Sequence, residues 1–149
     1  MPIIESKDIF NKDPLPVAHS LPGTTPATAA NYGVYFTAQF SCEILAFAAL
    51  WETASSSGTL TIEKLTGTTA PGSGVPLLSS TISTAGAANT VNHGVFIISG
   101  TARQLTRGDR LAIRDGGTLT NMVGLSTTSV IKPLGKGHYA YVFGTAPQV

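Results

Sequence analysis

The chain has 149 residues, the size of one domain, and 42% of them are hydrophobic, which is enough for a buried core. Charged residues make up only 11%, against about 25% in typical soluble domains, and the formal net charge is +1. A nearly neutral chain has no bulk field to attract nucleic acid or an anionic membrane, so neither is an expected partner. The abundance of Thr, Ser, Ala and Gly favours a protein packed into an assembly over a free monomer.

Residues 1–31 predict an extended N-terminal arm, followed by a folded domain over residues 32–149. The arm holds five of the nine prolines, and proline fixes φ and donates no backbone N–H, so regular sheet pairing is not expected there. The start of the chain mixes acids and lysines without the apolar run of a signal peptide, which predicts a soluble protein made inside the cell.

The arm is richer in large apolar residues than a disordered tail usually is. Two interpretations remain open: a mobile leader, or an arm that docks apolar anchors on a neighbouring subunit. The candidate anchors are Ile3, Ile4, Ile9, Phe10 and Leu15.

From Tyr32 onward the sequence reads as short strands separated by turn signals such as SSSG and DGG. In VYFTAQF, Val34, Phe36, Ala38 and Phe40 share one face, as expected of a half-buried strand. About eight strands predict an all-β fold, an antiparallel jelly-roll sandwich. The predicted strands are 34–40, 43–52, 59–65, 76–83, 90–99, 109–115, 123–132 and 138–143.

The segment CEILAFAALWETA fits this reading least well. Ile44, Phe47, Ala48 and Trp51 have helical spacing, and the composition favours a helix. As a strand the segment is apolar on both faces, which requires burial on both sides. Neighbouring strands of similar length and the following Ser-Ser-Ser-Gly turn favour the strand. One face would serve the core and the other a subunit interface.

The loop Gly67-Thr-Thr-Ala-Pro-Gly72-Ser-Gly74 raises the question of phosphate binding. A P-loop needs Lys and Ser/Thr directly after its last glycine, where this chain has Ser73 and Gly74. The segment that follows contains Pro76 and is a poor helix, so no helix N-terminus is available for a phosphate. We therefore predict a wide connection between adjacent strands.

No catalytic, cofactor-binding or metal-binding residue is assigned from the sequence. H-x-H, H-E-x-x-H, C-x-x-C and G-x-S-x-G are all missing, and Asp109 and Asp115 lie too far apart on one strand to act as a glycosidase pair. Asp109 closes an Arg-Gly-Asp triplet, where a turn-capping role is favoured over an integrin-type ligand. Cys42, beside apolar residues, is expected to be a small buried hydrophobe.

Four arginines form the one cluster of charge: Arg103, Arg107, Arg110 and Arg114. Arg110 and Arg114 share a strand face opposite Leu111 and Ile113, so both are expected to point outward. The alternatives are a solvated or salt-bridged face and a contact with an acidic protein partner.

Three stretches carry a resemblance to a known class of proteins: TLTIEKLTGTTAPGSGVPLLSSTIS, AANTV and LTRGDRLAIRDGGTLTNMVGLSTTSVIK. Over residues 32–133 the chain resembles jelly-roll virion surface proteins of tailed bacteriophages, of the capsid decoration (cement) or head-fibre type. The resemblance implies an antiparallel sandwich, oligomers that are often trimers, and no catalysis. It also supports the strand reading of residues 43–52.

The resemblance predicts a structural virion protein made in the host cytoplasm. It would decorate and stabilise the outer capsid lattice, with the major capsid protein and its own copies, as a homotrimer, for partners. The contact residues would be the arm anchors together with Arg110 and Arg114. The alternative is a carbohydrate- or receptor-binding module of a phage fibre or baseplate, in which Trp51, Tyr139 or Tyr141 would stack on sugars.

Overall fold

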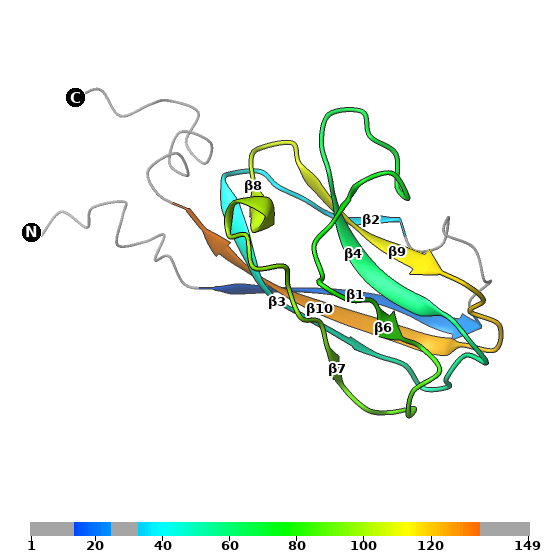
Figure 1. Cartoon of the computed structure of the whole chain (residues 1–149). Helices are drawn as coiled ribbons and strands as arrows, with labels where there is room; N and C mark the ends of the chain where they lie inside the picture. The colour runs from blue at the N-terminus through cyan, green and yellow to red at the C-terminus, as the bar shows by residue number, and fades with distance from the viewer. Residues whose placement is uncertain (1–13, 25–32, 135–149) are drawn as a thin grey trace, which may run out of the picture.

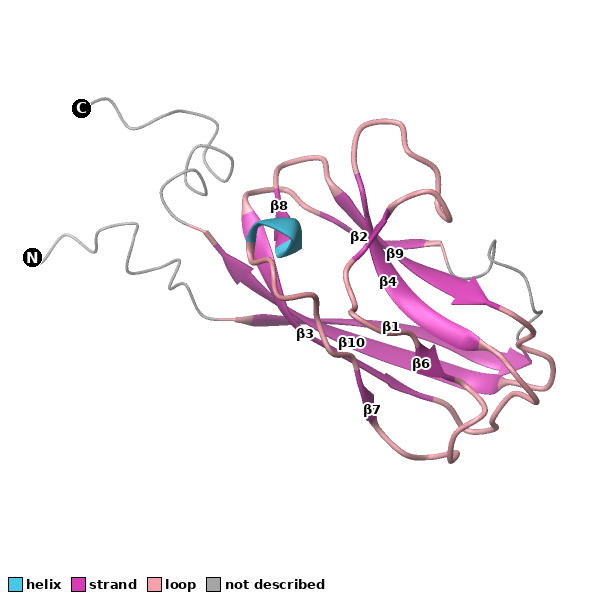
Figure 2. Ribbon diagram, viewed as in Figure 1, coloured by secondary structure: helices cyan, strands magenta, loops and turns pink. Residues whose placement is uncertain are grey.

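The computed structural model describes residues 14–24 and 33–134. This part of the chain is all-β, as predicted, and its strands form two antiparallel sheets in two layers (Figures 1 and 2). The first sheet has the order β1-β10-β3-β7, with β8 also paired to β3; its strands are β1 (Leu15–Thr24), β3 (Cys42–Leu50), β7 (Asn92–His93), β8 (Gln104–Leu105) and β10 (Val123–Pro133). The second has the order β2-β9-β4-β5, with β6 also paired to β4; its strands are β2 (Val34–Thr37), β4 (Thr59–Leu65), β5 (Val75–Pro76), β6 (Ile82–Ser83) and β9 (Arg110–Gly116).

One hydrophobic core lies between the two sheets. Both sheets contribute to it, because alternate residues of each strand point to opposite faces and one set points inward. The largest side chains that are almost fully buried are Ile44, Phe47, Trp51, Leu60, Ile62, Leu65, Leu77, Leu105, Leu111, Ile113 and Leu119.

The segment with helical spacing is strand β3, so the strand prediction is confirmed. It pairs with β10 on one side and with β7 and β8 on the other, and Ile44, Phe47 and Trp51 are buried. The pairing with β10 slips between Ile44 and Ala46, which leaves Leu45 as the extra residue of a β-bulge. The bulge breaks the alternation of the strand, which is why its sequence resembles a helix.

The predicted arm contains a strand. β1 pairs antiparallel with β10 from Leu15↔Ile131 to Thr24↔Val123, and Val17 packs on the core. The sheet therefore begins well before residue 32. β1 tolerates Pro16 and Pro22 because it is an edge strand, where a missing N–H on the outer side breaks no ladder bond. The residues of the arm before 14 and between 25 and 32 lie outside the described part.

Two predicted strands are each interrupted. Residues 76–83 supply β5 and β6, and between them the chain changes partner: the Leu77 N–H donates to Ile62 of β4, but Ser79 N–H donates to Val95. Residues 90–99 supply only β7, followed by the bridge Leu78↔Phe96. Residues 77–79 thus leave the second sheet to pair with 95–97. The predicted strand 138–143 lies outside the described residues.

The side chain of Tyr35 points inward, against the predicted alternation of β2. The pairing with β9 runs from Val34↔Ala112 directly to Phe36↔Leu111, so Tyr35 has no partner of its own in the register. Its hydroxyl bonds with the Ser129 hydroxyl of the opposite sheet at 2.8 Å. Its ring lies 5.8 Å from that of His19 on β1. The contacts of Tyr35 with Ser129 and His19 close the β1 side of the sandwich.

Candidate functional site

The glycine-rich loop between β4 and β5 does hold a carboxylate, but one from its own chain. Glu63 of β4 is fully buried, and its two carboxylate oxygens accept hydrogen bonds from the backbone N–H groups of Gly72 and Gly74 (3.0 Å for Gly74). Gly72 has a φ of 90°, a conformation that favours glycine. The predicted strand-to-strand connection is confirmed, because β4 and β5 pair antiparallel on either side of the loop.

Arg110 holds the other side of the same loop. Its guanidinium donates to the carbonyl oxygens of Gly67 at 2.9 Å and Thr69 at 2.8 Å. The side chain lies on the outer face of β9, as the alternation predicted, but its donors are engaged within the chain. A contact role for Arg110 stays a prediction, and the structure gives it a loop-holding role that the sequence did not indicate.

The Arg-Gly-Asp triplet forms a tight turn. Asp109 is buried, and its carboxylate accepts from the backbone N–H of Thr106 at 2.8 Å and from the Thr106 hydroxyl at 3.0 Å. The Asp109 N–H donates back to the Thr106 carbonyl, and Gly108 has a φ of 92°. The predicted turn role of Asp109 is confirmed, since its carboxylate faces the chain and not a partner.

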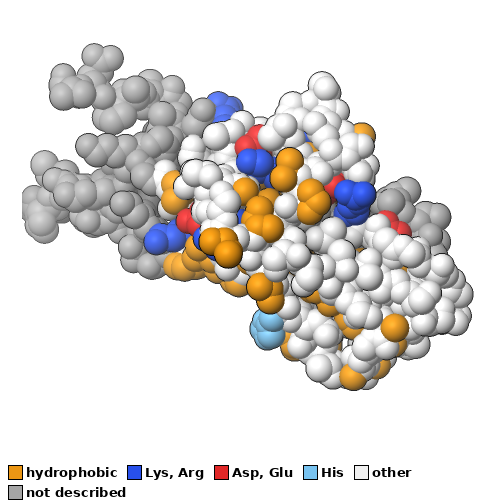
Figure 3. Space-filling model, in the orientation of Figure 1, with side chains coloured by type: hydrophobic (Ala, Val, Ile, Leu, Met, Phe, Trp, Pro, Cys, Tyr) orange, Lys and Arg blue, Asp and Glu red, His pale blue; other side chains and the backbone are white. Residues whose placement is uncertain are grey.

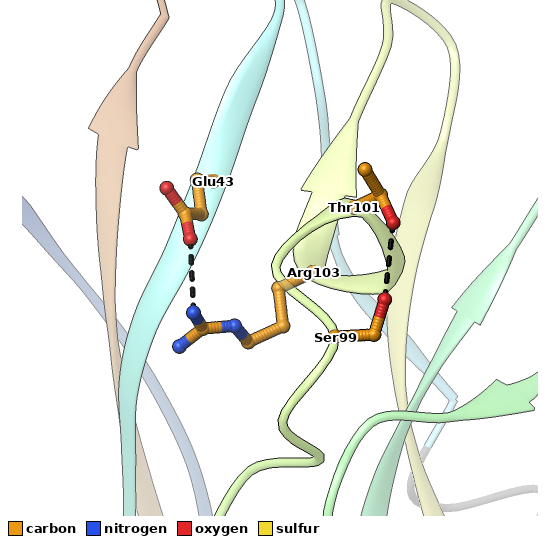
Figure 4. Close-up of polar contacts among 4 residues, drawn as sticks. All are labelled: Glu43, Ser99, Thr101 and Arg103. Atoms are coloured by element: carbon orange, nitrogen blue, oxygen red, sulfur yellow. Dashed lines mark hydrogen bonds and ion pairs between the residues drawn. The ribbon is translucent and has the colours of Figure 1, made fainter.

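The segment between β7 and β8 crosses the edge of β3. The Gly94 N–H donates to Phe47, and Gln104 pairs with Glu43, so residues 95–103 run beside Ile44–Ala46. Arg103, at the end of η2 (Thr101–Arg103), reaches Glu43 with an N–O distance of 3.2 Å (Figure 4). The Arg103 guanidinium also lies over the Phe96 ring, 5.9 Å from its centroid. These contacts fix the segment at both ends.

This segment exposes large apolar side chains. Ile98 is 100% exposed and Val95 64% exposed, and Leu45, the bulged residue of the adjacent β3, is 36% exposed. We call these three residues the apolar patch. Hydrophobic side chains gather over the stretch between β7 and η2 in the space-filling view (Figure 3). Contiguous exposed apolar surface marks interaction sites in soluble domains.

A groove of about 320 Å³ opens on the outer face of the second sheet. It forms where the chain after β5 changes partner, because residues 78–81 lift away from β4 before β6 returns to it. Its floor comes from two cross-strand pairs, Thr61↔Arg114 and Thr59↔Gly116. The other lining residues are Pro76, Leu78, Ser79, Ser80, Thr81 and Asp115.

The three sequence-predicted contact residues that the structure describes do not form one cluster. Ile3, Ile4, Ile9 and Phe10 lie outside the described residues. Leu15 begins β1 and is 50% exposed, while Arg110 and Arg114 lie on β9 in the other sheet. Trp51, one of the three residues that the alternative prediction offered for stacking on sugars, is fully buried and cannot do so. Tyr139 and Tyr141 lie outside the described part.

Burial favours the neutral forms of three side chains, those of Cys42, Tyr35 and His19. Burial, together with the charge of Asp109, raises the pKa of the Cys42 thiol to about 11, so this buried cysteine is not a ready nucleophile. Burial also raises the pKa of the Tyr35 phenol. Desolvation lowers the pKa of His19, whose Nε2 atom is buried without a hydrogen-bond partner among the described residues.

Comparisons with protein-family models, with curated proteins and with solved structures give no match to this chain. Within residues 14–24 and 33–134, no group of three or more His, Cys, Asp or Glu side chains could hold a metal ion. No helix in the same residues has the length and apolar character needed to cross a membrane.

Sequence reasoning missed the groove and foresaw the apolar patch only in part, for the same reason. Both arise where predicted strands are interrupted, around Ser79–Thr81 and Val95–Ile98, and alternation alone reads each stretch as continuous strand. The available signals were Gly94, which leaves no room for a Cβ beside Leu78, and the run Ser79-Ser80-Thr81. Neither indicates a change of pairing partner without the structure.

Proposed function

We propose that this chain is a jelly-roll structural protein of a phage virion, a decoration protein that binds the outer capsid lattice and stabilises it. The observation that carries the proposal is the strand order, β1-β10-β3-β7 in one sheet and β2-β9-β4-β5 in the other. With β5 and β6 taken as one interrupted strand, and β7 with β8 as another, this order supports a reading as eight strands with jelly-roll connections. Viral capsid and lectin domains share the jelly-roll arrangement.

The apolar patch supports a role within an assembly. Leu45, Val95 and Ile98 are large and exposed, and the charges of Glu43 and Arg103 next to them are paired with each other, although the buried Arg103 Nε atom has no hydrogen-bond partner among the described residues. A neighbouring copy packed on the patch would therefore bury apolar surface without leaving a buried charge without an ion-pair partner. In a homotrimer this surface would lie between subunits, and binding only the assembled shell would stabilise the shell by mass action.

The arm supplies the proposed capsid contact. Ile3, Ile4, Ile9 and Phe10 would anchor it on the major capsid protein, beginning just before β1. Because Leu15–Thr24 pairs with β10, a truncation that tests the arm must stop at residue 13. Removal of residues 1–20 would strip much of an edge strand and test folding instead.

The test is occupancy on purified virions, measured by cryo-electron microscopy with wild-type chain and with a chain lacking residues 1–13. We expect wild-type density on the head in hundreds of copies, and little or no density for the truncated chain. A matched variant, Ile3→Leu, keeps an apolar anchor and should retain wild-type occupancy. Equal occupancy of the truncated and full chains would refute the arm contact, and density on the tail alone would refute the decoration role.

The alternative, a carbohydrate- or receptor-binding module of a fibre or baseplate, is favoured by one observation, the groove on the second sheet. A copy number of a few tens or fewer per particle would favour this role over decoration.

A further inference from the structure

We propose that the groove on the outer face of the second sheet binds a sugar unit of a surface polysaccharide. The groove is lined by β4, β9, Pro76 and residues 78–81, and it adjoins the apolar patch at Ser79, whose N–H donates to the Val95 carbonyl. The inference does not depend on the decoration role, because a decoration protein and a fibre module can each carry such a site.

Size is the first argument. A volume of about 320 Å³ lies at the lower end of the range for small-molecule sites, about 300–1,000 Å³. This volume suits one or two pyranose rings. It is small for an extended peptide, which would need a longer channel.

The lining has the two characters that a pyranose requires. The exposed Pro76 and the methyl group of the half-buried Thr59 offer an apolar surface for the C–H face of a ring, and Leu78 and Thr61, only 6% and 7% exposed, add little to it. Hydroxyl groups of Ser80 and Thr81 stand at the wall, and a ring's hydroxyl rim would exchange hydrogen bonds with them. Both residues are exposed, so a ligand can reach them.

The charged groups of the groove are free to bind. Within the described part of the chain, neither the Arg114 nor the Asp115 side chain makes a hydrogen bond or ion pair, although both residues are half-buried. Arg110, four residues earlier on the same strand face, donates instead to the carbonyl oxygens of Gly67 and Thr69 in the loop. Arg114 thus offers guanidinium donors, and Asp115 carboxylate acceptors, to the hydroxyls of a ring.

Binding is tested with the full chain labelled with ¹⁵N and titrated with galactose, N-acetylglucosamine and glucuronic acid, using glycerol as a polyol without a ring. We expect at least one sugar to shift the amide signals of Thr61, Ser80 and Arg114, while glycerol does not. Arg114→Ala and Ser80→Trp, the second of which fills the groove, should each weaken binding at least about tenfold.

Ser56→Trp places the same bulk on an exposed turn outside the groove and should leave binding unchanged. Unfolding curves of all variants would show that the fold is intact, and Arg114→Lys keeps a charge if Arg114→Ala proves unstable. The proposal is overturned if none of the three sugars shifts the groove signals at millimolar concentration. It is also overturned if sugar binding survives in a folded Ser80→Trp variant.

Discussion

Glu63 is a carboxylate without solvent exposure, and two backbone amides of its own loop satisfy it. The same arrangement binds phosphates and other anions in nucleotide enzymes, where the N–H groups of a glycine-rich loop converge on an external ligand. Here the strand that leads into the loop supplies the anion. Close backbone approach explains Gly74, whereas Gly67 and Gly72 are favoured by their positive φ, and the loop has a structural role.

Replacing Glu63 with alanine should lower the free energy of unfolding by about 2–3 kcal/mol, because two loop amides lose their charged acceptor. Glu63→Gln keeps one acceptor oxygen and should cost less. Urea denaturation measures both, with Glu52→Gln as the control, since Glu52 is exposed and its change should stay within about 0.5 kcal/mol. Equal stability of wild type and Glu63→Ala would contradict the proposed role of the carboxylate.

Gly74 is required by space. A Cβ there would lie 2.5 Å from Leu65 Cδ2 and 2.7 Å from the Lys64 carbonyl oxygen, and the carbonyl belongs to the paired part of β4 and cannot move aside. Gly74→Ala should therefore destabilise the domain by about 1–3 kcal/mol.

Gly33→Ala is the matched control for Gly74→Ala, because nothing lies within 4 Å of a Cβ at that position. Its effect should be neutral or slightly stabilising through the unfolded chain. The comparison is made by thermal unfolding of the two variants. Equal midpoint temperatures for Gly74→Ala and Gly33→Ala would show that the loop can shift to accommodate the added Cβ.

At the scale of single elements, β1 depends on pH through His19. The folded-state pKa of His19 is lowered by desolvation, so the unfolded chain takes up the proton first as the pH falls. Stability should be complete above the unfolded pKa of 6.5 and decline below it, until the folded-state pKa is also passed. The nearest ring, Tyr35, stays protonated throughout this window.

The measurement is urea denaturation between about pH 7.5 and about pH 5.5, a range that brackets the histidine titration. Wild type should lose stability across this range, whereas His19→Gln should lose less. His93→Gln, at an exposed position, should follow wild type. A His19→Gln variant with the wild-type pH slope would assign the slope to other groups.

The sequence predicted the long elements well and the interrupted ones poorly. Alternation located β4, β9 and β10, because each pairs along its whole length. β1 was missed because its prolines indicate an arm, and only its edge position makes them acceptable. Residues 76–83 and 90–99 were each read as one strand, since a change of pairing partner between them depends on tertiary contacts.

The candidate sites were less predictable than the fold. Arg110 and Arg114 have the same residue type and the same strand face, yet only the structure separates the arginine that holds a loop from the one that stands free. The apolar patch was foreseen in part: the sequence suggested that residues 43–52 use one face at an interface, and Leu45 is exposed there. Its more exposed members, Val95 and Ile98, were expected in a strand.

At the scale of the whole molecule, the patch predicts self-association. Ile98→Asp should convert a trimer to a monomer, because it places a charge at the centre of the proposed subunit contact. The fold itself should survive, since the Ile98 side chain is fully exposed in the single chain. Analytical ultracentrifugation gives the mass of each species.

Val75→Asp is the control for the trimer prediction, because Val75 is 54% exposed and lies on β5 of the other sheet. It should leave the mass of the wild-type species unchanged. A wild-type chain that sediments as a monomer at every concentration would refute self-association through the patch. A trimer that persists in Ile98→Asp would place the contact elsewhere.

The antiparallel pairing of β1 with β10 gives the domain a direction-dependent mechanical strength. Residues 14 and 134 leave the sheet at the same end, since Leu15 faces Ile131 and β10 ends at Pro133. A force that separates these two residues would break the β1–β10 hydrogen bonds one after another, starting at this end of the sheet. A pull on residue 14 against a domain held by its neighbours would instead load the paired length of β1 in shear, because ladder bonds run perpendicular to the strands. The strand β1 would therefore resist a force applied through an arm bound to a shell better than it resists a force that peels it from its end.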